Sequence, residues 1–207
     1  MTVYEPREDS ELIKKYVEKL AFGLVLDMGT GSGILAVAAA GHKTVSSVLG
    51  VDVHRGTIST CKKIKNKKIR WGVSDLFGTV AGKFDTIIFN HPYLPGQQGE
   101  DKDTARVVAG GKHGWELLAR FFSFAGNYLH ADGRMIILFS SLTNKEKIDQ
   151  IIFENGFVSE LLEEAPLFFE KLYCYDVRWD PVLAAAVKKG VCDITYLTHG
   201  RRGTIFV

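Results

Sequence analysis

The chain has 207 residues, of which 46% are hydrophobic and 24% charged, and its formal net charge at pH 7 is +2. This length suits one domain built around a sheet with helices on both faces, and the small net charge does not indicate a nucleic-acid-binding protein. No apolar run approaches the roughly 20 residues that span a bilayer, and the charged N-terminus MTVYEPREDSELIKKY has no signal-peptide pattern, so we expect a cytoplasmic protein without a membrane role.

Short β-rich runs alternate with helical stretches, which is the pattern of an α/β fold with a mostly parallel sheet. The first half predicts a helix over 9–20, a strand over 24–28, a helix over 32–41, a strand over 46–53, a helix over 55–65, and strands near 68–73 and over 84–90. Asp9 or Ser10 can cap the first helix. The run FDTIIFN is almost wholly apolar and ends in a polar residue, as in a central parallel strand. We expect the chemistry at the carboxyl end of that strand.

The second half predicts a helix near 113–129, a strand over 133–141, a helix over 144–155, and an antiparallel pair made of FVSELLEEAPL and KLYCYDVRW. The last stretch, 191–207, has two β-rich runs around HGRRG, which predict a hairpin. The basic run KKIKNKKIR at 62–70 is interpreted as a solvated helix end and loop. Cys61, Cys174 and Cys192 are odd in number and form no CxxC pair, so we expect neither disulfides nor a metal site.

A glycine-rich turn follows the first predicted strand in LVLDMGTGSG, with Gly29, Gly31 and Gly33 leading into a helix. Glycines allow positive φ and a close approach of the backbone to a ligand, and the helix start presents free N–H groups. Asp52 ends the second strand, where a carboxylate can accept the hydroxyls of a ribose. Nicotinamide enzymes share such glycines, but Asp27 would repel a pyrophosphate and attract the ammonium group of S-adenosylmethionine. The pattern therefore favours this methyl donor as the cofactor.

Asp75 and Leu76 follow the third strand at the same end of the predicted sheet. The carboxylate of Asp75 can accept from an adenine amino group, and Leu76 can lie against the adenine face. Taken alone, Asp75 would equally suit a turn or a helix cap.

Asn90-His91-Pro92-Tyr93 follows the fourth predicted strand. The side-chain oxygen of Asn90 and the main-chain carbonyl of His91 can together accept both hydrogens of a planar NH2 group. Such a nitrogen is a poor nucleophile, so holding it in line with a methyl group is the main contribution available. Tyr93 can stack on the planar group and Pro92 stiffens the loop. These residues are predicted to form the catalytic site.

The Asn90–Tyr93 segment resembles the Asn-Pro-Pro-Tyr signature of amino-group methyltransferases that act on adenine N6 or glutamine N5. VYEPREDS and AGGKHGWELLARFF are similar to segments of the archaeal and eukaryotic single-domain release-factor glutamine methyltransferases, relatives of HemK. The resemblance covers residues 3 to about 179. It implies a class I methyltransferase with a Rossmann-like seven-stranded sheet over 1–180, and leaves 181–207 as a C-terminal extension of the same domain.

The resemblance also assigns roles to individual residues, and implies methylation of the glutamine of a Gly-Gly-Gln motif in a class I release factor. The residues that match contacts to the methyl donor are Ser10, Asp27, Gly29, Gly31, Asp52, Asp75, Leu76 and Asn90. Asn90 also matches the contact to the substrate glutamine. Tyr4, Glu5 and Pro6 match a strap over the site, or an ordered arm.

One position departs from the signature, because His91 stands where the family has its first proline. The main-chain carbonyl is retained, but the fixed φ is lost. Single-domain relatives commonly need a small zinc-binding activator subunit that covers a strand edge; here the candidate edge is KIRWGVSD, with Trp71 either exposed there or in the core. GRRG at 200–203 is interpreted as an exposed turn.

Two other functions remain open from the sequence alone. Adenine N6 methylation of RNA or DNA would use the same Asn90–Tyr93 chemistry, although the near-neutral charge does not favour a nucleic-acid partner. A non-catalytic protein that only binds the donor is the second, and His91 is its sole support.

Overall fold

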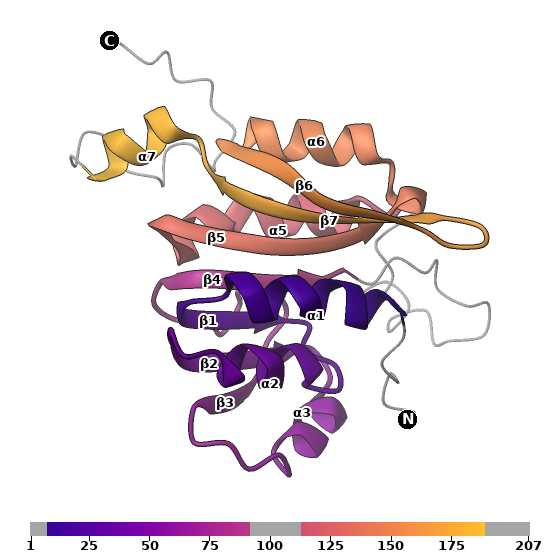
Figure 1. The fold of residues 1–207 in the computed structure, drawn as a ribbon. Helices are drawn as coiled ribbons and strands as arrows, with labels where there is room; N and C mark the ends of the chain where they lie inside the picture. The colour runs from indigo at the N-terminus through magenta and orange to yellow at the C-terminus, as the bar shows by residue number, and fades with distance from the viewer. Residues whose placement is uncertain (1–7, 92–112, 189–207) are drawn as a thin grey trace.

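The computed structural model describes residues 8–91 and 113–188. A seven-stranded sheet has the order β3-β2-β1-β4-β5-β7-β6 (Figure 1). The strands are β1 Gly23–Met28, β2 Val45–Asp52, β3 Ile69–Val73, β4 Phe84–Asn90, β5 Leu129–Ser140, β6 Phe157–Pro166 and β7 Lys171–Trp179. The helices are α1 Glu8–Leu20, α2 Ile34–Gly41, α3 Arg55–Cys61, α5 Glu116–Tyr128, the 3-10 helix η1 Ser141–Thr143, α6 Lys145–Glu154 and α7 Pro181–Lys188.

The first five strands run parallel and β7 is antiparallel to both of its neighbours. This arrangement confirms the predicted Rossmann-like sheet, including the antiparallel pair made of β6 and β7. None of the helices within 8–91 and 113–188 is long and apolar enough to cross a membrane.

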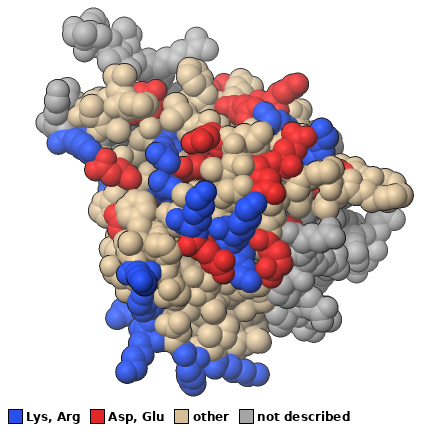
Figure 2. All heavy atoms as spheres, in the orientation of Figure 1, with Lys and Arg blue, Asp and Glu red and all other residues tan. Residues whose placement is uncertain are grey.

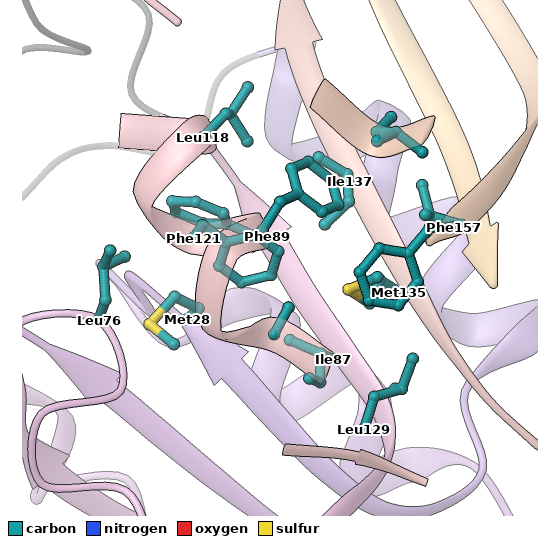
Figure 3. Close-up of a cluster of buried hydrophobic side chains, with 14 of the residues drawn as sticks. Met28, Leu76, Ile87, Phe89, Leu118, Phe121, Leu129, Met135, Ile137 and Phe157 are labelled. Atoms are coloured by element: carbon teal, nitrogen blue, oxygen red, sulfur yellow. The ribbon is translucent and has the colours of Figure 1, made fainter. Parts of the chain in front are cut away.

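Apolar side chains fill both faces of the sheet. Ile87 and Phe89 of β4 pack with α5 and α6, whereas Ile88 between them packs with α1 and α2 on the opposite face. In Figure 3, Phe89 and Phe121 point toward each other, and their ring centroids are 4.9 Å apart. The continuous apolar run of β4 is thus explained, because successive side chains of a strand alternate between faces and both faces are covered here.

Several predicted boundaries differ from the structure. Asp9 and Ser10 are not caps of the first helix, because both lie inside the first turns of α1 and are buried. The second helix begins at Ile34 rather than 32, and α3 ends at Cys61 rather than 65, where the N–H of Ile64 bonds to the Cys61 carbonyl in a turn.

The second half shows two further differences. Strand β5 begins at Leu129, four residues earlier than predicted, because the backbone becomes extended there and pairs with β4. The helix α7 was not predicted. The predicted hairpin over 191–207 and the GRRG turn lie outside the described residues.

Trp71 lies on β3, which is an edge strand of the sheet as predicted. Its indole is partly buried rather than exposed, and it covers Gly33 and Gly50: a Cβ built on Gly50 would lie 2.5 Å from Trp71 Cζ3, and one on Gly33 would lie 2.9 Å from Cη2. The exposed apolar side chain of this strand is Val73, at 37% exposure. Through Trp71, the edge strand β3 therefore packs against the glycine-rich turn at Gly33.

We predict that Gly50→Ala lowers the free energy of unfolding by about 1–3 kcal/mol, because the new methyl group overlaps the Trp71 ring. Adding Trp71→Leu should recover part of that loss, so that the double variant is more stable than the sum of the single changes implies. Gly41→Ala is the matched control, since a Cβ there meets nothing within 4 Å. Urea unfolding measures all four variants, and additive effects would contradict the overlap.

Candidate active site

The carboxyl ends of three parallel strands meet at one edge of the sheet. Met28 of β1 pairs with Val51 of β2 on one side and with Phe89 of β4 on the other. The next residue along each strand is therefore at the same level. These residues are Gly29, Asp52 and Asn90, which the sequence predicted as site residues from segments far apart in the chain.

The glycine-rich turn has the backbone that the sequence predicted. Gly29, Gly31 and Gly33 have φ values of 65°, 53° and 82°, which other residues rarely adopt. The Gly31 N–H donates to Asp52 Oδ2 at 3.1 Å, and the Thr30 N–H donates to the Val51 carbonyl at 2.8 Å. The turn is thus fixed to the end of the neighbouring strand β2.

Asp27 is 1% exposed at the end of β1. Its Oδ2 accepts from Thr30 Oγ1 at 2.5 Å and from the Ala36 N–H at 3.1 Å, whereas Oδ1 has no hydrogen-bond partner within the described chain. Burial raises the pKa of the Asp27 carboxyl to about 7. A buried acceptor without a partner is costly, and a cationic ammonium group is the ligand chemistry that fits it.

Asp52 is held by main-chain donors on two sides. Its Oδ2 accepts from Gly31 and its Oδ1 accepts from the His54 N–H at 2.9 Å. The carboxylate is thereby oriented at the strand end, where ribose hydroxyls were predicted to bind.

Cys61 also holds the glycine-rich turn, and the sequence did not predict this role. Its thiol donates to the Gly31 carbonyl at 3.2 Å. Burial, with smaller contributions from Asp27 and Asp52, raises the pKa of the thiol to about 11. The thiol is therefore a neutral donor and not a nucleophile; no local motif marks it, because 30 residues separate it from Gly31.

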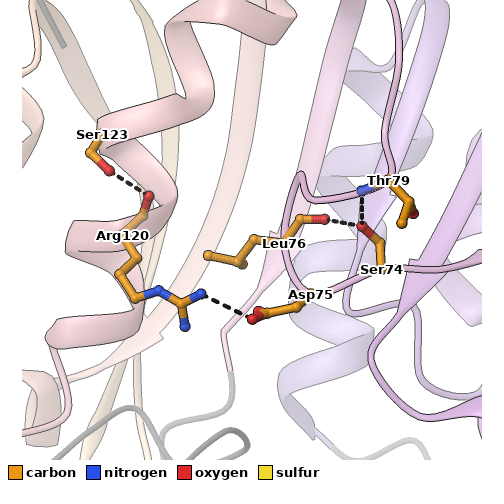
Figure 4. Close-up of polar contacts among 6 residues, drawn as sticks. All are labelled: Ser74, Asp75, Leu76, Thr79, Arg120 and Ser123. Atoms are coloured by element: carbon orange, nitrogen blue, oxygen red, sulfur yellow. Dashed lines mark hydrogen bonds and ion pairs between the residues drawn. The ribbon is translucent and has the colours of Figure 1, made fainter. Parts of the chain in front are cut away.

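Asp75 and Leu76 lie just beyond β3, facing α5 (Figure 4). The Asp75 carboxylate forms an ion pair with Arg120 at 3.0 Å, which the sequence did not predict. Leu76 has φ 45° and is buried; its carbonyl accepts from Ser74 Oγ at 2.7 Å, and that hydroxyl accepts from the Thr79 N–H. The two predicted adenine contacts are therefore held in one short, braced turn, with Leu76 in a conformation unusual for its residue type.

Asn90 ends β4, and its side chain contacts the start of α1. Asn90 Nδ2 donates to Asp9 Oδ2 at 3.1 Å, while Asn90 Oδ1 is buried without a hydrogen-bond partner among the described residues. Ser10 Oγ donates to Asp9 Oδ1 at 3.4 Å, which is a long contact. The structure thus brings the predicted residues Ser10 and Asn90 together around Asp9, for which the sequence suggested only a role as a helix cap.

His91 is 1% exposed, and neither of its ring nitrogens has a hydrogen-bond partner in the described structure. Its ring lies edge-on to Phe89, with centroids 5.7 Å apart. Burial lowers the pKa of His91 to about 3, so the ring is neutral at physiological pH and a weak base.

Some predicted residues fall outside the described ranges. They are Tyr4, Glu5, Pro6, Pro92 and Tyr93. Among the described residues, no three His, Cys, Asp or Glu side chains are grouped in a way that could hold a metal ion.

Comparison with known proteins identifies a matching family model and several related sequences. The family model described as "Methyltransferase small domain" matches residues 8–161. The "Putative protein N5-glutamine methyltransferase MJ0928" of Methanocaldococcus jannaschii is 38% identical over 175 residues, covering 82% of this chain and 88% of the relative. Mouse "Methyltransferase HEMK2" is 29% identical over 167 residues, covering 73% and 76%.

Among solved structures, the E. cuniculi Mtq2-Trm112 complex, described as responsible for methylation of the eRF1 translation termination factor, has a chain with a similar fold. The TM-score is 0.70 at 22% identity, and the match covers 87% of this chain and 100% of that one.

We predict that Asp27 and His91 contribute opposite pH dependences to stability. Between pH 4 and 7 folded Asp27 keeps a proton that the unfolded chain has released, so its contribution falls as pH rises, by at most about 1.4 kcal/mol per unit. The pKa of His91 is lowered on folding, so its contribution is lost as pH falls below about 6.5. Asp27→Asn should therefore lose more stability than wild type on acidification from pH 6.5 to 4.5. Urea unfolding across this range measures the difference, and a pH-independent difference would refute the shifted pKa of Asp27.

Proposed function

The chain belongs to the methyltransferase small domain family and is a HemK-like, S-adenosylmethionine-dependent methyltransferase, and we propose that it methylates the side-chain amide nitrogen of a glutamine in a class I release factor. The observation that carries the proposal is Asn90 Oδ1. This oxygen is buried, has no partner in the described chain, and stands at the end of β4 beside the glycine-rich turn. An N–H of a planar carboxamide would satisfy it.

The donor-binding residues are proposed from the site and from the family resemblance. Asp27 Oδ1 would accept from the ammonium group of the donor, and the backbone of Gly29 and Gly31 would lie along its methionine part. Asp52 would accept from the ribose hydroxyls, while Asp75 and Leu76 would contact the adenine and Ser10 would help to close over the donor. The sulfonium group of the bound donor supplies an electrophilic methyl group.

The protein's own residues would act on the acceptor nitrogen. Its lone pair is delocalised into the amide, so the protein has to hold it in line and to favour the form in which that lone pair is free. Asn90 Oδ1 would accept one hydrogen, and the His91 carbonyl would accept the other. The N–CH3 bond would form as the S–CH3 bond breaks, with its electron pair left on sulfur, and the methylated nitrogen would then release one of its protons to water. The His91 ring is not required as a base, and its low pKa suits it poorly to that role. Pro92 and Tyr93 would complete the loop against the planar group.

A glutamine is preferred to an adenine for two reasons. The 38% identical relative is named for N5-glutamine, and the E. cuniculi complex is described as methylating a termination factor. The face seen in Figure 2 carries Asp and Glu side chains among its Lys and Arg side chains across the centre and upper part, so this face does not present the continuous basic surface that a nucleic-acid partner would need. The basic run 62–70 lies at the end of α3, in the loop after it and at the start of β3, and one of its residues, Lys68, donates to the carbonyls of His42 and Val45 in the protein itself. This run is therefore explained as a helix end, loop and strand start without a nucleic-acid partner.

We also propose that a small zinc-binding activator subunit covers the free edge of β3. The relative in the E. cuniculi structure is in a complex with Trm112. In this chain β3 ends the sheet, and Val73 is an exposed apolar residue on it. An unpaired strand edge of this kind is usually covered.

The decisive assay follows labelled methyl transfer from S-adenosylmethionine to a release factor that carries Gly-Gly-Gln, with RNA and DNA as competing acceptors and with or without an activator subunit. We predict label on the glutamine, and a loss in kcat/KM of about 100- to 1000-fold for Asn90→Ala, because an acceptor aimed at the reacting group is removed. Asn66→Ala, at an exposed loop asparagine, is the matched control and should retain full activity.

The other outcomes of this assay are informative. Label on nucleic acid would replace the glutamine proposal with adenine N6 methylation. Donor binding without any transfer would support the non-catalytic alternative.

A further inference from the structure

We infer that Asp9 is a positioning residue that fixes the Asn90 carboxamide so that Oδ1 faces the reacting nitrogen. The inference rests on the proposed amide methylation and adds a residue to that site. Asp9 is 4% exposed, although it lies at the first turn of a helix. Its carboxylate reaches the end of β4 across a separation of 81 residues in sequence.

The orientation of the Asn90 carboxamide follows from the chemistry of its partner. An ionised carboxylate can only accept hydrogen bonds, so the group that faces Asp9 Oδ2 at 3.1 Å has to be the Asn90 NH2. A rotation of the amide by 180° would place its oxygen against the carboxylate and would leave the NH2 group pointing at the acceptor nitrogen. Asp9 therefore selects the orientation in which Oδ1 is free to accept.

The same contact strengthens Asn90 as an acceptor. A carboxylate that accepts from an amide N–H polarises that amide, which increases the negative charge on its oxygen, and the effect is larger in a buried site. As the acceptor nitrogen forms its bond to the methyl carbon it becomes more positive. A more negative Oδ1, with the Asp9 charge behind it, would stabilise that nitrogen more than it stabilises the uncharged amide.

The neighbouring Ser10 and the packing of α1 help to hold the carboxylate of Asp9 in place. Ser10 Oγ donates to its other oxygen, and α1 packs against β4 and β5 through Ile13 and Val17, which are 0% exposed. The anchor of Asn90 is thus set by the helix that precedes the sheet, and a change in the position of α1 would change the direction of Oδ1.

Asp9→Asn tests the inference with little change in size. The neutral side chain removes the charge and no longer dictates which end of the Asn90 amide faces it. We expect kcat for methyl transfer to fall about 10- to 100-fold, with KM for the substrate and the Kd of S-adenosylmethionine changed less than about threefold. Glu11→Gln is the control, because Glu11 is an exposed carboxylate of α1 that pairs with Lys14; it should keep wild-type kcat.

A swapped pair gives a readout that a merely structural role would not produce. Asn90→Asp alone places two carboxylates together. Combining it with Asp9→Asn exchanges the two groups, so that the amide introduced on α1 can donate to the carboxylate introduced at the end of β4. The double variant should therefore have a higher kcat than Asn90→Asp alone. Unchanged kcat in Asp9→Asn, no recovery in the double variant, or a fall in kcat matched by a fall in Tm would overturn the inference.

A measurement without substrate separates this inference from the proposed function. In the 15N spectrum of the wild-type protein the side-chain NH2 of Asn90, assigned from its loss in Asn90→Ala, should include one proton that exchanges slowly with water. That protection should disappear in Asp9→Asn and persist in Glu11→Gln. Absence of protection in the wild type would refute the role of Asp9 even if glutamine is methylated, and protection without any methyl transfer would refute only the proposed function.

Discussion

The register of the three central parallel strands is the constraint on which the site depends. Because Met28 pairs with both Val51 and Phe89, the residues that follow these three positions come to one level of the sheet. Those residues carry the glycine turn, the Asp52 carboxylate and the Asn90 amide. A shift of one residue would turn each strand's side chains to the opposite face, and it is opposed by the apolar clusters packed on both sides. The stability of the core and the geometry of the chemistry are therefore set by the same pairing.

The site retains buried polar atoms that the protein does not satisfy by itself. Asp27 Oδ1, Asn90 Oδ1 and the two ring nitrogens of His91 all lack partners within the described residues. Each lowers the stability of the folded state by an amount comparable to a lost hydrogen bond. The two oxygens lie where the donor and the acceptor are proposed to bind, so these ligands would supply the missing hydrogen bonds. His91 differs, because its ring lies against Phe89 on the α5 face of the sheet, and its unpaired nitrogens have no ligand assigned.

The sequence was sufficient for the fold, and for expecting Gly29, Asp52 and Asn90 at the carboxyl ends of neighbouring strands, because both follow local patterns. The alternation of strands and helices and the apolar run of β4 predict the sheet, and the glycines predict the turn. The contacts of Asp9, Cys61 and Arg120 were not predicted, since each joins segments at least 30 residues apart. Asp9 or Ser10 was predicted to cap the helix, because Asp and Ser are among the residues preferred at helix N-caps. The sequence allowed Trp71 to be either exposed or in the core. The structure shows it partly buried, with its ring over Gly33 and Gly50, which are 38 and 21 residues earlier in the chain.

The strand order also determines when the site can form during synthesis. Strand β1 lies in the middle of the sheet, but one of its edges stays open until β4, which begins at Phe84, has been made. Helix α1 precedes the sheet in sequence, and besides α2 it packs on β4, β5 and β7, so its apolar side is fully covered only once these later strands exist. A nascent chain that ends before β5 would thus expose both the apolar side of α1 and the edge of β4. The segment that anchors Asn90 is therefore translated before the strands that hold it, and the unfinished chain exposes apolar surface until those strands have been made.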